Sequence, residues 1–487
     1  MPSAPKAPST RVSPQTRLTA VIVACAFFMQ NLDSTVIATA LPTMARAFGT
    51  DPVRMNVALT AYLLSLTVFI PASGWVADRY GTRNVFRAAI VVFTLGSIWC
   101  GLSNGLFELV IARIVQGLGG AMMVPVGRLL LLRTAAKTEM VAAMAWLTMP
   151  ALLGPVVGPP VGGFIVTWFD WRWTFYINIP VGILGLIAVT LFIKDFREPP
   201  RSGFDLRGLL LSGAALACAM FGLETAGRGV VAPELTAAMI AAGVAAAFLY
   251  YLHARRHPAP LLDFTLMRLP CFGLSFCAMM LFRTGIGAIP FLLPMMLQVG
   301  FGDSAARSGL ITFASSAGAL VMKPAAQHAL RLFGFRDTLI WNGVLSGIML
   351  IACAAFRPTW PAAAIYLVLL LGGFLRSLQF TAYNTLAYGD VSRARMSAAT
   401  SLYTAGQQLA ATIGVTIGAM ALEVARLFSG HAEPTIGDFS AAFVVVGLMT
   451  LAAAPIAILM PLNAGDDLTG RQTVVPEPRE APRRAGE

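Results

Sequence analysis

Asp33 is an acidic side chain deep inside the apolar segment 18–41. A carboxylate in such a place is costly unless it is neutralised, paired or turned toward water. Desolvation favours the protonated form of a carboxyl group, so a buried acid can take up and release protons near neutral pH. The position therefore predicts reversible proton binding at Asp33. The alternative is a structural aspartate that bonds to the backbone or to Arg113.

Arg113 is a basic side chain in a second apolar segment, 106–133, and Gln116 follows it by one turn on the same helix face. An arginine cannot be discharged in a protein, so a buried one needs an anionic or polar partner. Asp33 is the expected partner of Arg113.

Two further arginines, Arg283 and Arg376, lie near the middle of the apolar segments 270–299 and 361–388. The residues that follow Arg376 repeat at helical spacing and predict one polar and aromatic helix face, suited to a ligand. This face comprises Arg376, Gln379, Phe380, Tyr383 and Asn384. Lys323, in contrast, is expected to extend its ammonium group to the inner surface.

A charged, glycine-containing sequence joins the second and third apolar segments. Glycine supplies a tight turn, and the acid is expected near the positive end of the following helix, with the basic groups facing the cell interior. This arrangement predicts a loop that latches two helices reversibly, whereas a plain basic loop is the alternative. The residues are Gly74, Asp78, Arg79, Gly81 and Arg83.

The fifth apolar segment, 138–168, contains glycines four residues apart together with prolines. Small residues at this spacing let another helix approach closely, and prolines bend the backbone. The sequence predicts a flexible helix contact at Gly154, Gly158, Pro159, Gly162 and Gly163.

Composition places the whole chain in a membrane, because 57% of its 487 residues are hydrophobic and only 12% are charged. The net charge of +12 lies at segment ends, which fits the positive-inside rule better than nucleic-acid binding. The six cysteines and four histidines are scattered, so we expect neither disulfides nor a metal site. Because no nucleophile or pair of catalytic carboxylates stands out, we do not expect an enzyme.

A bilayer crossing needs roughly 20 mostly apolar residues, and the chain divides into fourteen such segments. Their basic flanks place both termini in the cytoplasm, with 1–17 and a disordered 463–487 as tails. The segments are 18–41, 53–73, 82–103, 106–133, 138–168, 174–194, 206–226, 234–253, 270–299, 306–328, 336–356, 361–388, 396–428 and 438–462.

The latch sequence resembles the G-x-x-x-D-R-x-G-x-R signature of the major facilitator superfamily, with Thr82 where relatives often carry a basic residue. The 154–163 sequence is similar to the antiporter signature G-x-x-x-G-P-x-x-G-G, and the sequence 32–42 resembles L-D-x-T-x-x-x-x-A-L-P. The sequence 109–117 matches L-x-x-x-R-x-x-Q-G. Together they resemble fourteen-span drug:proton antiporters of the EmrB/QacA type, in particular an MdtD-like multidrug transporter subgroup.

This resemblance implies an all-α integral membrane fold with a six-helix bundle at 18–194, an inserted hairpin at 195–269 and a second bundle at 270–462. It implies that the helices of Asp33, Arg113, Arg283 and Arg376 line a central cavity, and we also place Gln116, Gln379, Phe380, Tyr383 and Asn384 there. Four such charges would be costly facing lipid. One acid against three arginines predicts a positive cavity that prefers anionic or neutral amphiphiles.

The implied function is proton-coupled export of small amphiphilic molecules from the cell across the inner membrane. Asp33 and Arg113 are the expected proton-coupling residues, and the proton gradient replaces any cofactor. Expected partners are substrate, protons and membrane lipid, with no nucleic acid, and a periplasmic partner stays open. A proton-coupled symporter shares the fold and Asp33, and a non-transporting membrane receptor is a more distant alternative.

Overall fold

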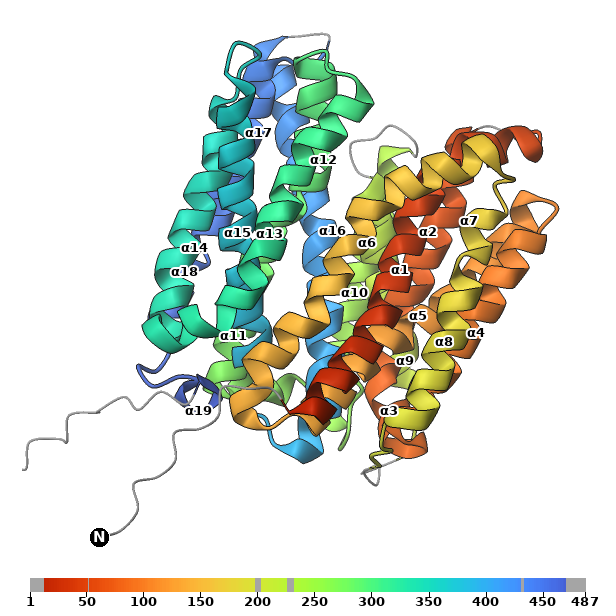
Figure 1. Cartoon of the computed structure of the whole chain (residues 1–487), viewed down its shortest axis with the longest axis vertical. Coiled ribbons are helices and arrows are strands. Elements are labelled where there is room, and N and C mark those ends of the chain that lie inside the picture. Colours follow the sequence, from red (N-terminus) through yellow and green to blue (C-terminus); the bar gives the residue numbers. More distant parts are fainter. Residues whose placement is uncertain (1–12, 51, 198–202, 226–231, 431–432, 470–487) are drawn as a thin grey trace, which may run out of the picture.

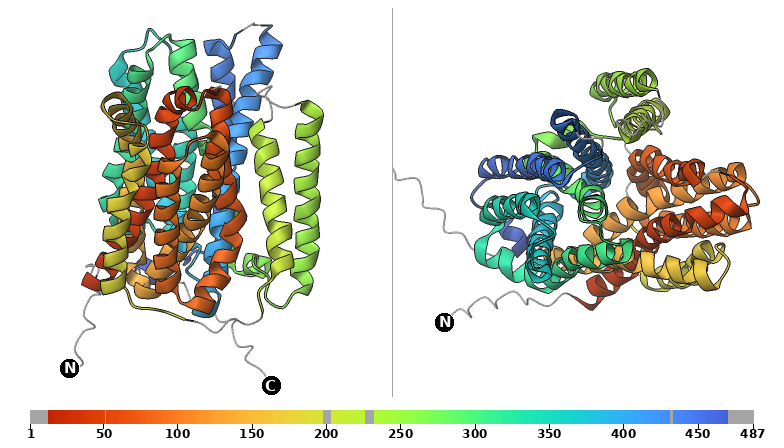
Figure 2. Two further views of the ribbon diagram at one scale, coloured as in Figure 1. Left: turned by 90° about the vertical axis from the view of Figure 1, so that its right-hand side faces the viewer. Right: turned by 90° about the horizontal axis from the view of Figure 1, so that it is seen from above.

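The computed structural model describes residues 13–50, 52–197, 203–225, 232–430 and 433–469. All the regular secondary structure in these ranges is helical, and the helices form two bundles with a hairpin beside them (Figures 1 and 2). The tails predicted at 1–17 and 463–487 lie largely outside these ranges. Where they are described, the helix α1 already begins at Pro14, and a short helix stands at Asp466–Thr469.

The first bundle contains eight helices in chain order. The short turn Ile70–Ala72 continues α2 directly into α3, and α7 is followed at once by α8, so each pair acts as one membrane segment. The helices are α1 (Pro14–Ala47), α2 (Pro52–Phe69), α3 (Ser73–Tyr80), α4 (Thr82–Leu102), α5 (Leu106–Thr134), α6 (Met140–Trp168), α7 (Trp173–Tyr176) and α8 (Asn178–Phe192).

The hairpin consists of α9 (Leu206–Thr225) and α10 (Pro233–Arg256), which lie outside the two bundles when viewed from above (Figure 2). Its helix α9 packs against α2 and α16. The second bundle then follows as α11 (Pro270–Gly287), α12 (Ile289–Met295), α13 (Ala305–Phe333), α14 (Phe335–Ala352), α15 (Ala362–Leu386), α16 (Met396–Ser429), α17 (Ile436–Leu451) and α18 (Ala454–Ile458). The short α19 (Asp466–Thr469) comes after it and contacts both α6 and α13.

Twelve helical segments in the described ranges are long and apolar enough to cross a membrane. The other two predicted segments, 138–168 and 306–328, correspond to α6 and α13, which have 29 residues each. These two helices pack against each other across the boundary between the bundles (Figure 1). The predicted order of segments is therefore present, with boundaries that differ by a few residues.

The two bundles carry matching turns. Gly81 joins α3 to α4 with φ +91°, and Gly334 joins α13 to α14 with φ +78°. A positive φ suits glycine because it has no Cβ. The agreement between the turns supports a repeated architecture in which the second copy lacks the acidic residue of the first.

One end of the molecule holds the start of α1 together with α3 and α19, and we call this end the α3 side (Figure 1). The opposite end, where α7 lies, is the α7 side. Large apolar side chains are exposed on the outer surfaces of the helices, among them Leu95, Leu184, Val244, Phe248 and Trp341. In water such a surface would be unfavourable, so its apolar character fits contact with lipid.

Candidate functional site

Asp33 and Arg113 form an ion pair inside the first bundle. Arg113 Nη1 lies 2.6 Å from Asp33 Oδ2, and the two side chains are 0% and 1% exposed. The other carboxylate oxygen accepts hydrogen bonds from Gln116 Nε2 at 2.9 Å and from Asn178 Nδ2 at 2.8 Å. Both Asp33 oxygens therefore have partners, which offsets the desolvation of the charge.

A second layer of side chains holds this network in place. The Ser97 hydroxyl accepts hydrogen bonds from Gln116 Nε2 at 2.7 Å and from Asn178 Nδ2 at 3.2 Å. The Arg113 guanidinium lies 4.2 Å from the centre of the Tyr62 ring, close enough for a cation–π contact. The network thus joins α1, α2, α4, α5 and α8, and Asn178, Ser97 and Tyr62 are members that the sequence motifs did not indicate.

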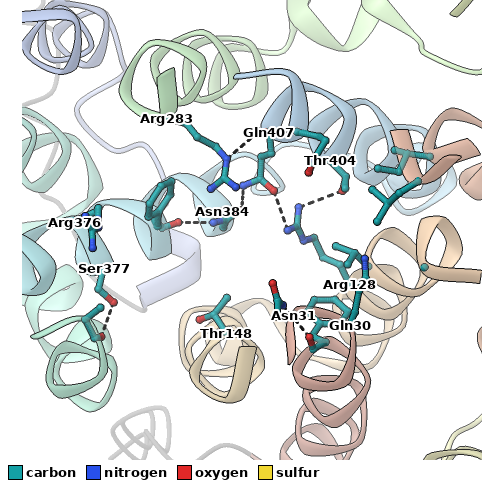
Figure 3. A pocket seen from close by; sticks show the side chains of 18 of the residues that line it. Gln30, Asn31, Arg128, Thr148, Arg283, Arg376, Ser377, Asn384, Thr404 and Gln407 are labelled. Atoms are coloured by element: carbon teal, nitrogen blue, oxygen red, sulfur yellow. Dashed lines mark hydrogen bonds between the residues drawn. The ribbon is translucent and has the colours of Figure 1, made fainter. Parts of the chain in front are cut away.

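A cavity of about 370 Å³ lies between the two bundles (Figure 3). Its apolar wall includes Phe27, Leu66, Ile70 and Val124. Its polar wall contains four basic side chains and no acidic one among the described lining residues. The polar lining comprises Gln30, Asn31, Arg128, Thr148, Arg283, Ser316, Lys323, Arg376, Ser377, Asn384, Thr404, Gln407 and Gln408.

Gln407 organises one side of the cavity. Arg283 Nε donates to the Gln407 carbonyl at 2.8 Å, and Arg128 Nη2 donates to the Gln407 side-chain oxygen at 3.1 Å (Figure 3). Gln407 Nε2 in turn donates to Asn384 Oδ1 at 2.9 Å. Arg128 comes from α5, whereas Gln407 belongs to α16, so this chain of bonds crosses between the bundles.

The other basic groups have neutral partners. Arg376 Nη2 donates to the Ser315 hydroxyl at 2.7 Å, and Lys323 Nζ donates to the Thr381 hydroxyl at 3.1 Å. The expectation that Lys323 reaches the inner surface is therefore wrong, because its side chain is 5% exposed and lines the cavity. Among the described residues, these four basic side chains of the cavity bond to neutral groups and to no carboxylate.

The structure divides the residues that the sequence placed in the cavity. Arg283, Arg376, Phe380 and Asn384 line it. Asp33, Arg113 and Gln116 do not, because the network described above encloses them in the first bundle. Gln379 and Tyr383 also turn away: Gln379 donates to the Leu339 carbonyl at 2.9 Å and to the Tyr383 hydroxyl at 3.2 Å, on the side where α15 packs against α14.

The latch residues connect the two bundles on the α3 side. Asp78 accepts a hydrogen bond from Arg133 Nη2 at 2.8 Å, and the Ser397 hydroxyl of α16 donates to its other oxygen. A side chain at Gly74 would lie 2.7 Å from the Ser397 carbonyl, so only glycine permits this approach of α3 to α16. The Ser73 and Ser401 hydroxyls are 2.9 Å apart and add a further link.

Other residues of the latch sequence contact the loop that follows α8. The Arg83 backbone N–H donates to Asp195 Oδ1 at 3.1 Å, and the same carboxylate lies where a Cβ of Gly81 would be. Thr82, which departs from the family pattern, donates its backbone N–H to the Phe196 carbonyl at 3.0 Å. Arg79 is exposed. The Thr82 position therefore anchors the segment that leads to the hairpin.

The glycines of α6 pack directly against α1, the helix of Asp33. A Cβ at Gly154 would lie 2.8 Å from Asn31 Cβ, and Cβ atoms at Gly158 and Gly162 would overlap the hydroxyls of Thr35 and Thr39. Gly163 has open space around it, and the side chain of Pro159 lies outside what the structure describes. Three of the four glycines are thus required for the contact between α1 and α6.

Two helical bundles around a polar central cavity, with a charged connection closing one side, define a membrane transport protein. Residues 23–254 and 274–484 match the family model described as Major Facilitator Superfamily, and the chain belongs to this family.

Named relatives are similar in sequence, and solved structures share the fold. The chain is 39% identical over 414 residues to proteins named "Putative multidrug resistance protein MdtD" from Salmonella heidelberg (strain SL476) and Salmonella typhimurium (strain LT2), covering 85% of this chain and 88% of each relative. The human organic anion transporter MFSD10 (TETRAN) aligns with a TM-score of 0.68 at 14% identity, over 91% of this chain and 100% of that one. The proton:xylose symporter XylE aligns with a TM-score of 0.65 at 16% identity, over 93% of this chain and 98% of that one.

Proposed function

We propose that this multi-pass membrane protein is a proton-coupled antiporter that exports small amphiphilic organic molecules by alternating access. The observation that carries the proposal is the double role of α1 and α5. Each contributes one partner of the buried Asp33–Arg113 pair, and each also contributes to the cavity wall, α1 through Asn31 and α5 through Arg128. A change of charge at Asp33 is therefore transmitted along the same helices that hold substrate.

The coupling follows from the charge of the pair. Protonation of Asp33 removes the anion opposite Arg113, which leaves a buried cation with only neutral partners and favours a rearrangement of α1 and α5. The close contact between α6 and α1 at Gly154 and Gly158 supplies a surface on which α1 can shift. Substrate in the cavity favours the opposite arrangement, so proton and substrate exclude each other.

We further propose that the α3 side faces the cytoplasm of a cell whose inner membrane holds the protein. The bond from Ser397 of α16 to Asp78 joins the two bundles on this side in the present conformation, and Arg133, from the same bundle as Asp78, pairs with the same carboxylate. Release of these bonds opens the cavity to the cytoplasm for loading, and their return accompanies release of substrate outside. The proton gradient supplies the free energy, with membrane lipid as the surroundings and no bound cofactor.

The cavity indicates which substrates are favoured. Its apolar wall suits amphiphilic molecules, and the names of the curated relatives support multidrug export. Arg128, Arg283, Arg376 and Lys323 form a basic wall with no acidic residue among the described lining. Guanidinium groups bind carboxylate and sulfonate oxygens well, whereas a cationic substrate would be repelled. Anionic or neutral amphiphiles are therefore the favoured substrates.

Purified protein in liposomes, given an imposed pH gradient, tests the proposal. Suitable probes are a naphthalenesulfonate dye, a neutral coumarin and tetraphenylphosphonium, since the first and last keep their charge at all relevant pH values. An antiporter accumulates probe in liposomes with an acidic lumen, whereas a symporter accumulates it when the outside is acidic. A protein that binds probe but accumulates none under either gradient would be a receptor.

Arg376→Gln tests the charge preference. Loss of one guanidinium should lower uptake of the sulfonate dye about tenfold, the equivalent of 1.4 kcal/mol, and should leave uptake of the neutral probe nearly unchanged. Arg357→Gln, at an exposed surface position, is the matched control. If Arg376→Gln and Arg357→Gln lower uptake of the sulfonate dye equally, the basic wall does not select substrate charge. This outcome would not affect the antiport mechanism.

A further inference from the structure

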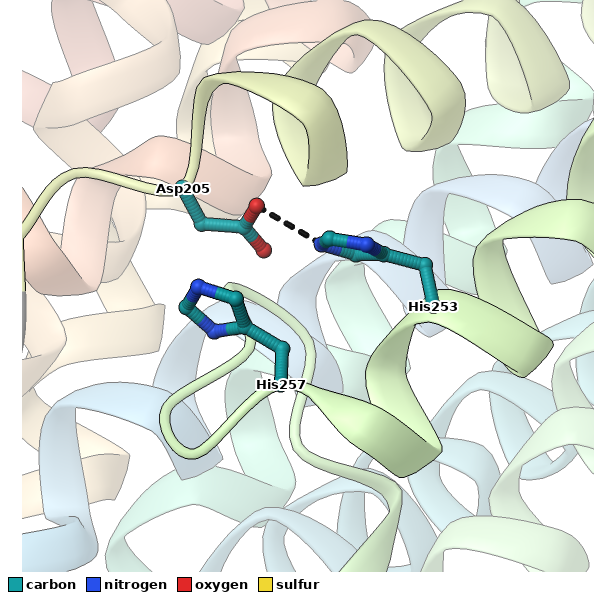
Figure 4. Close-up of side chains that lie close together, drawn as sticks. All are labelled: Asp205, His253 and His257. Carbon is teal, nitrogen blue, oxygen red and sulfur yellow. Dashed lines mark hydrogen bonds and ion pairs between the residues drawn. The ribbon is translucent and has the colours of Figure 1, made fainter.

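Asp205, His253 and His257 come together at one end of the hairpin (Figure 4), and His257 lies beside a hollow that α3 also lines. Asp205 immediately precedes α9, His253 belongs to the last turn of α10, and His257 follows the end of that helix. One potential ligand atom from each residue lies within 4.8 Å of the other two. The sequence separation of 48 residues between Asp205 and His253 hid this cluster, and we expected no metal site from the scattered histidines.

The carboxylate at the centre of the cluster is incompletely satisfied. Asp205 Oδ1 is 2.8 Å from His253 Nε2 and also accepts the Gly208 backbone N–H at 2.8 Å. Its second oxygen, Oδ2, is buried and has no hydrogen-bond partner among the described residues, although the side chain is only 3% exposed. A buried carboxylate oxygen without a partner is costly, and a cation beside it would remove this cost.

An ion pair between Asp205 and His253 does not explain the position of the second histidine, His257. His253 alone completes a pair with Asp205, yet His257 stands four residues later and turns its ring toward the same carboxylate (Figure 4). His257 is the C-cap residue of α10, one turn after His253, and two histidines four residues apart are a common pair of metal ligands. His257 Nδ1 accepts the Ala259 N–H at 3.3 Å, a contact long enough to be given up when the ring binds an ion.

We propose that Asp205, His253 and His257 bind a divalent late transition-metal ion, with Zn²⁺ as the best match. Imidazole nitrogen and carboxylate oxygen are ligands that Zn²⁺ favours, and three protein ligands leave a fourth position for water. Arg255 and Arg256 lie close in sequence, but both side chains are exposed, where solvent screens their charge.

A bound ion would fasten the start of α9 to the end of α10. His257 also lines a hollow of about 750 Å³ that includes Gly74, Asp78 and Ser397 of the latch. Arg395 next to α16 is joined to Asp263 of the following loop at 2.8 Å. Metal binding would therefore stiffen the segment beside the latch, without a direct role in the central cavity.

The test uses the full-length protein in detergent, freed of any polyhistidine tag and treated with a chelator. Titration with Co²⁺, which reports its ligands by visible absorption, should show one site per chain, and Zn²⁺ should displace Co²⁺. Zn²⁺ should also raise the melting temperature, because it binds the folded state. His253→Ala, His257→Ala and Asp205→Asn should each weaken binding on the order of tenfold or more.

His328→Ala, which removes an exposed histidine on α13, is the matched control and should bind Co²⁺ as the unaltered protein does. The proposal is overturned by a lack of saturable binding to the unaltered protein, or by equal binding in His257→Ala and His328→Ala. His257 makes one weak hydrogen bond, so this variant should fold. Gel filtration and the melting temperature without metal verify that each variant is intact, and the titration requires no transport activity.

Discussion

The Arg113 guanidinium donates to the Asp33 carboxylate at 2.6 Å, although the two residues are 80 positions apart in sequence. The pair lies outside the central cavity but on two helices that line it. Substrate therefore need not touch the acidic group to affect it. Competition between proton and substrate can instead act through the positions of α1 and α5, which makes the pair the centre of the proposed mechanism.

Removal of one partner should destabilise the fold more than removal of both. Asp33→Asn leaves Arg113 buried without an anion, and breaking such a pair costs about 3 to 5 kcal/mol. The double variant Asp33→Asn with Arg113→Gln should regain much of this loss, because neither charge is then buried. Thermal unfolding in detergent measures the difference. A double variant less stable than the single one would contradict the account.

The contact between α1 and α6 should depend on individual glycines. Gly158→Ala places a methyl group against Thr35, and overpacking of this kind typically costs about 1 to 3 kcal/mol. Gly163→Ala, five residues later, has open space and should be tolerated. Melting temperature and transport rate should fall in the first variant alone. Equal behaviour of the two variants would show that the glycines have no packing role.

The latch should control access from the α3 side. Asp78→Asn removes the ion pair with Arg133 and weakens acceptance from Ser397, so this side should open more often. In a variant without native cysteines, a thiol introduced by Ser401→Cys should then react faster with a water-soluble maleimide. Asp170→Asn, which breaks an exposed pair with Arg172 on the α7 side, is the control. Unchanged labelling in Asp78→Asn would exclude the latch role.

Asp390 should make stability depend on pH. This residue lies in the loop between α15 and α16, where burial raises the pKa of its carboxyl group. The folded state then holds the proton more tightly than the unfolded chain, whose aspartates have pKa values of about 3.9. The stability that protonation provides is complete below that value and is lost as pH rises through the folded pKa.

Asp390→Asn should abolish this dependence. The amide stays neutral and its oxygen can still accept the Cys271 backbone N–H, which donates to Asp390 at 2.8 Å. The variant should therefore gain stability over the unaltered protein as pH rises from about 4. Asp467→Asn, at a largely exposed carboxylate, is the control. Parallel melting curves against pH for the variant and the unaltered protein would refute the assignment.

The fold could be predicted from sequence because the signal for a membrane helix is a continuous apolar length, which composition alone reveals. The pairing of Asp33 with Arg113 could be suggested because each is a costly charge in an apolar segment. The resemblance to a known family was still needed to divide the segments into two bundles and a hairpin.

Other features depend on contacts between segments that are far apart in the sequence. Helical spacing groups side chains on a face but does not say what that face contacts. Gln379 and Tyr383 were therefore assigned to the cavity, although Gln379 bonds to α14 and Tyr383 contacts Phe282 of α11. Arg128 and Lys323 were missed as cavity residues for the same reason. Asn178 belongs to the network around Asp33 through a contact between residues 145 positions apart, and no local pattern carries that information.

Substrate-induced proton release from liposomes tests the central claim most directly, with the unaltered protein and Asp33→Asn compared for the probe that is transported best. We expect the unaltered protein to release protons when substrate is added. Asp33→Asn should release none and accumulate no substrate against a gradient, yet still exchange labelled for unlabelled substrate, which shows that it is folded. Undiminished proton release by Asp33→Asn would contradict the assignment of Asp33 as the proton carrier.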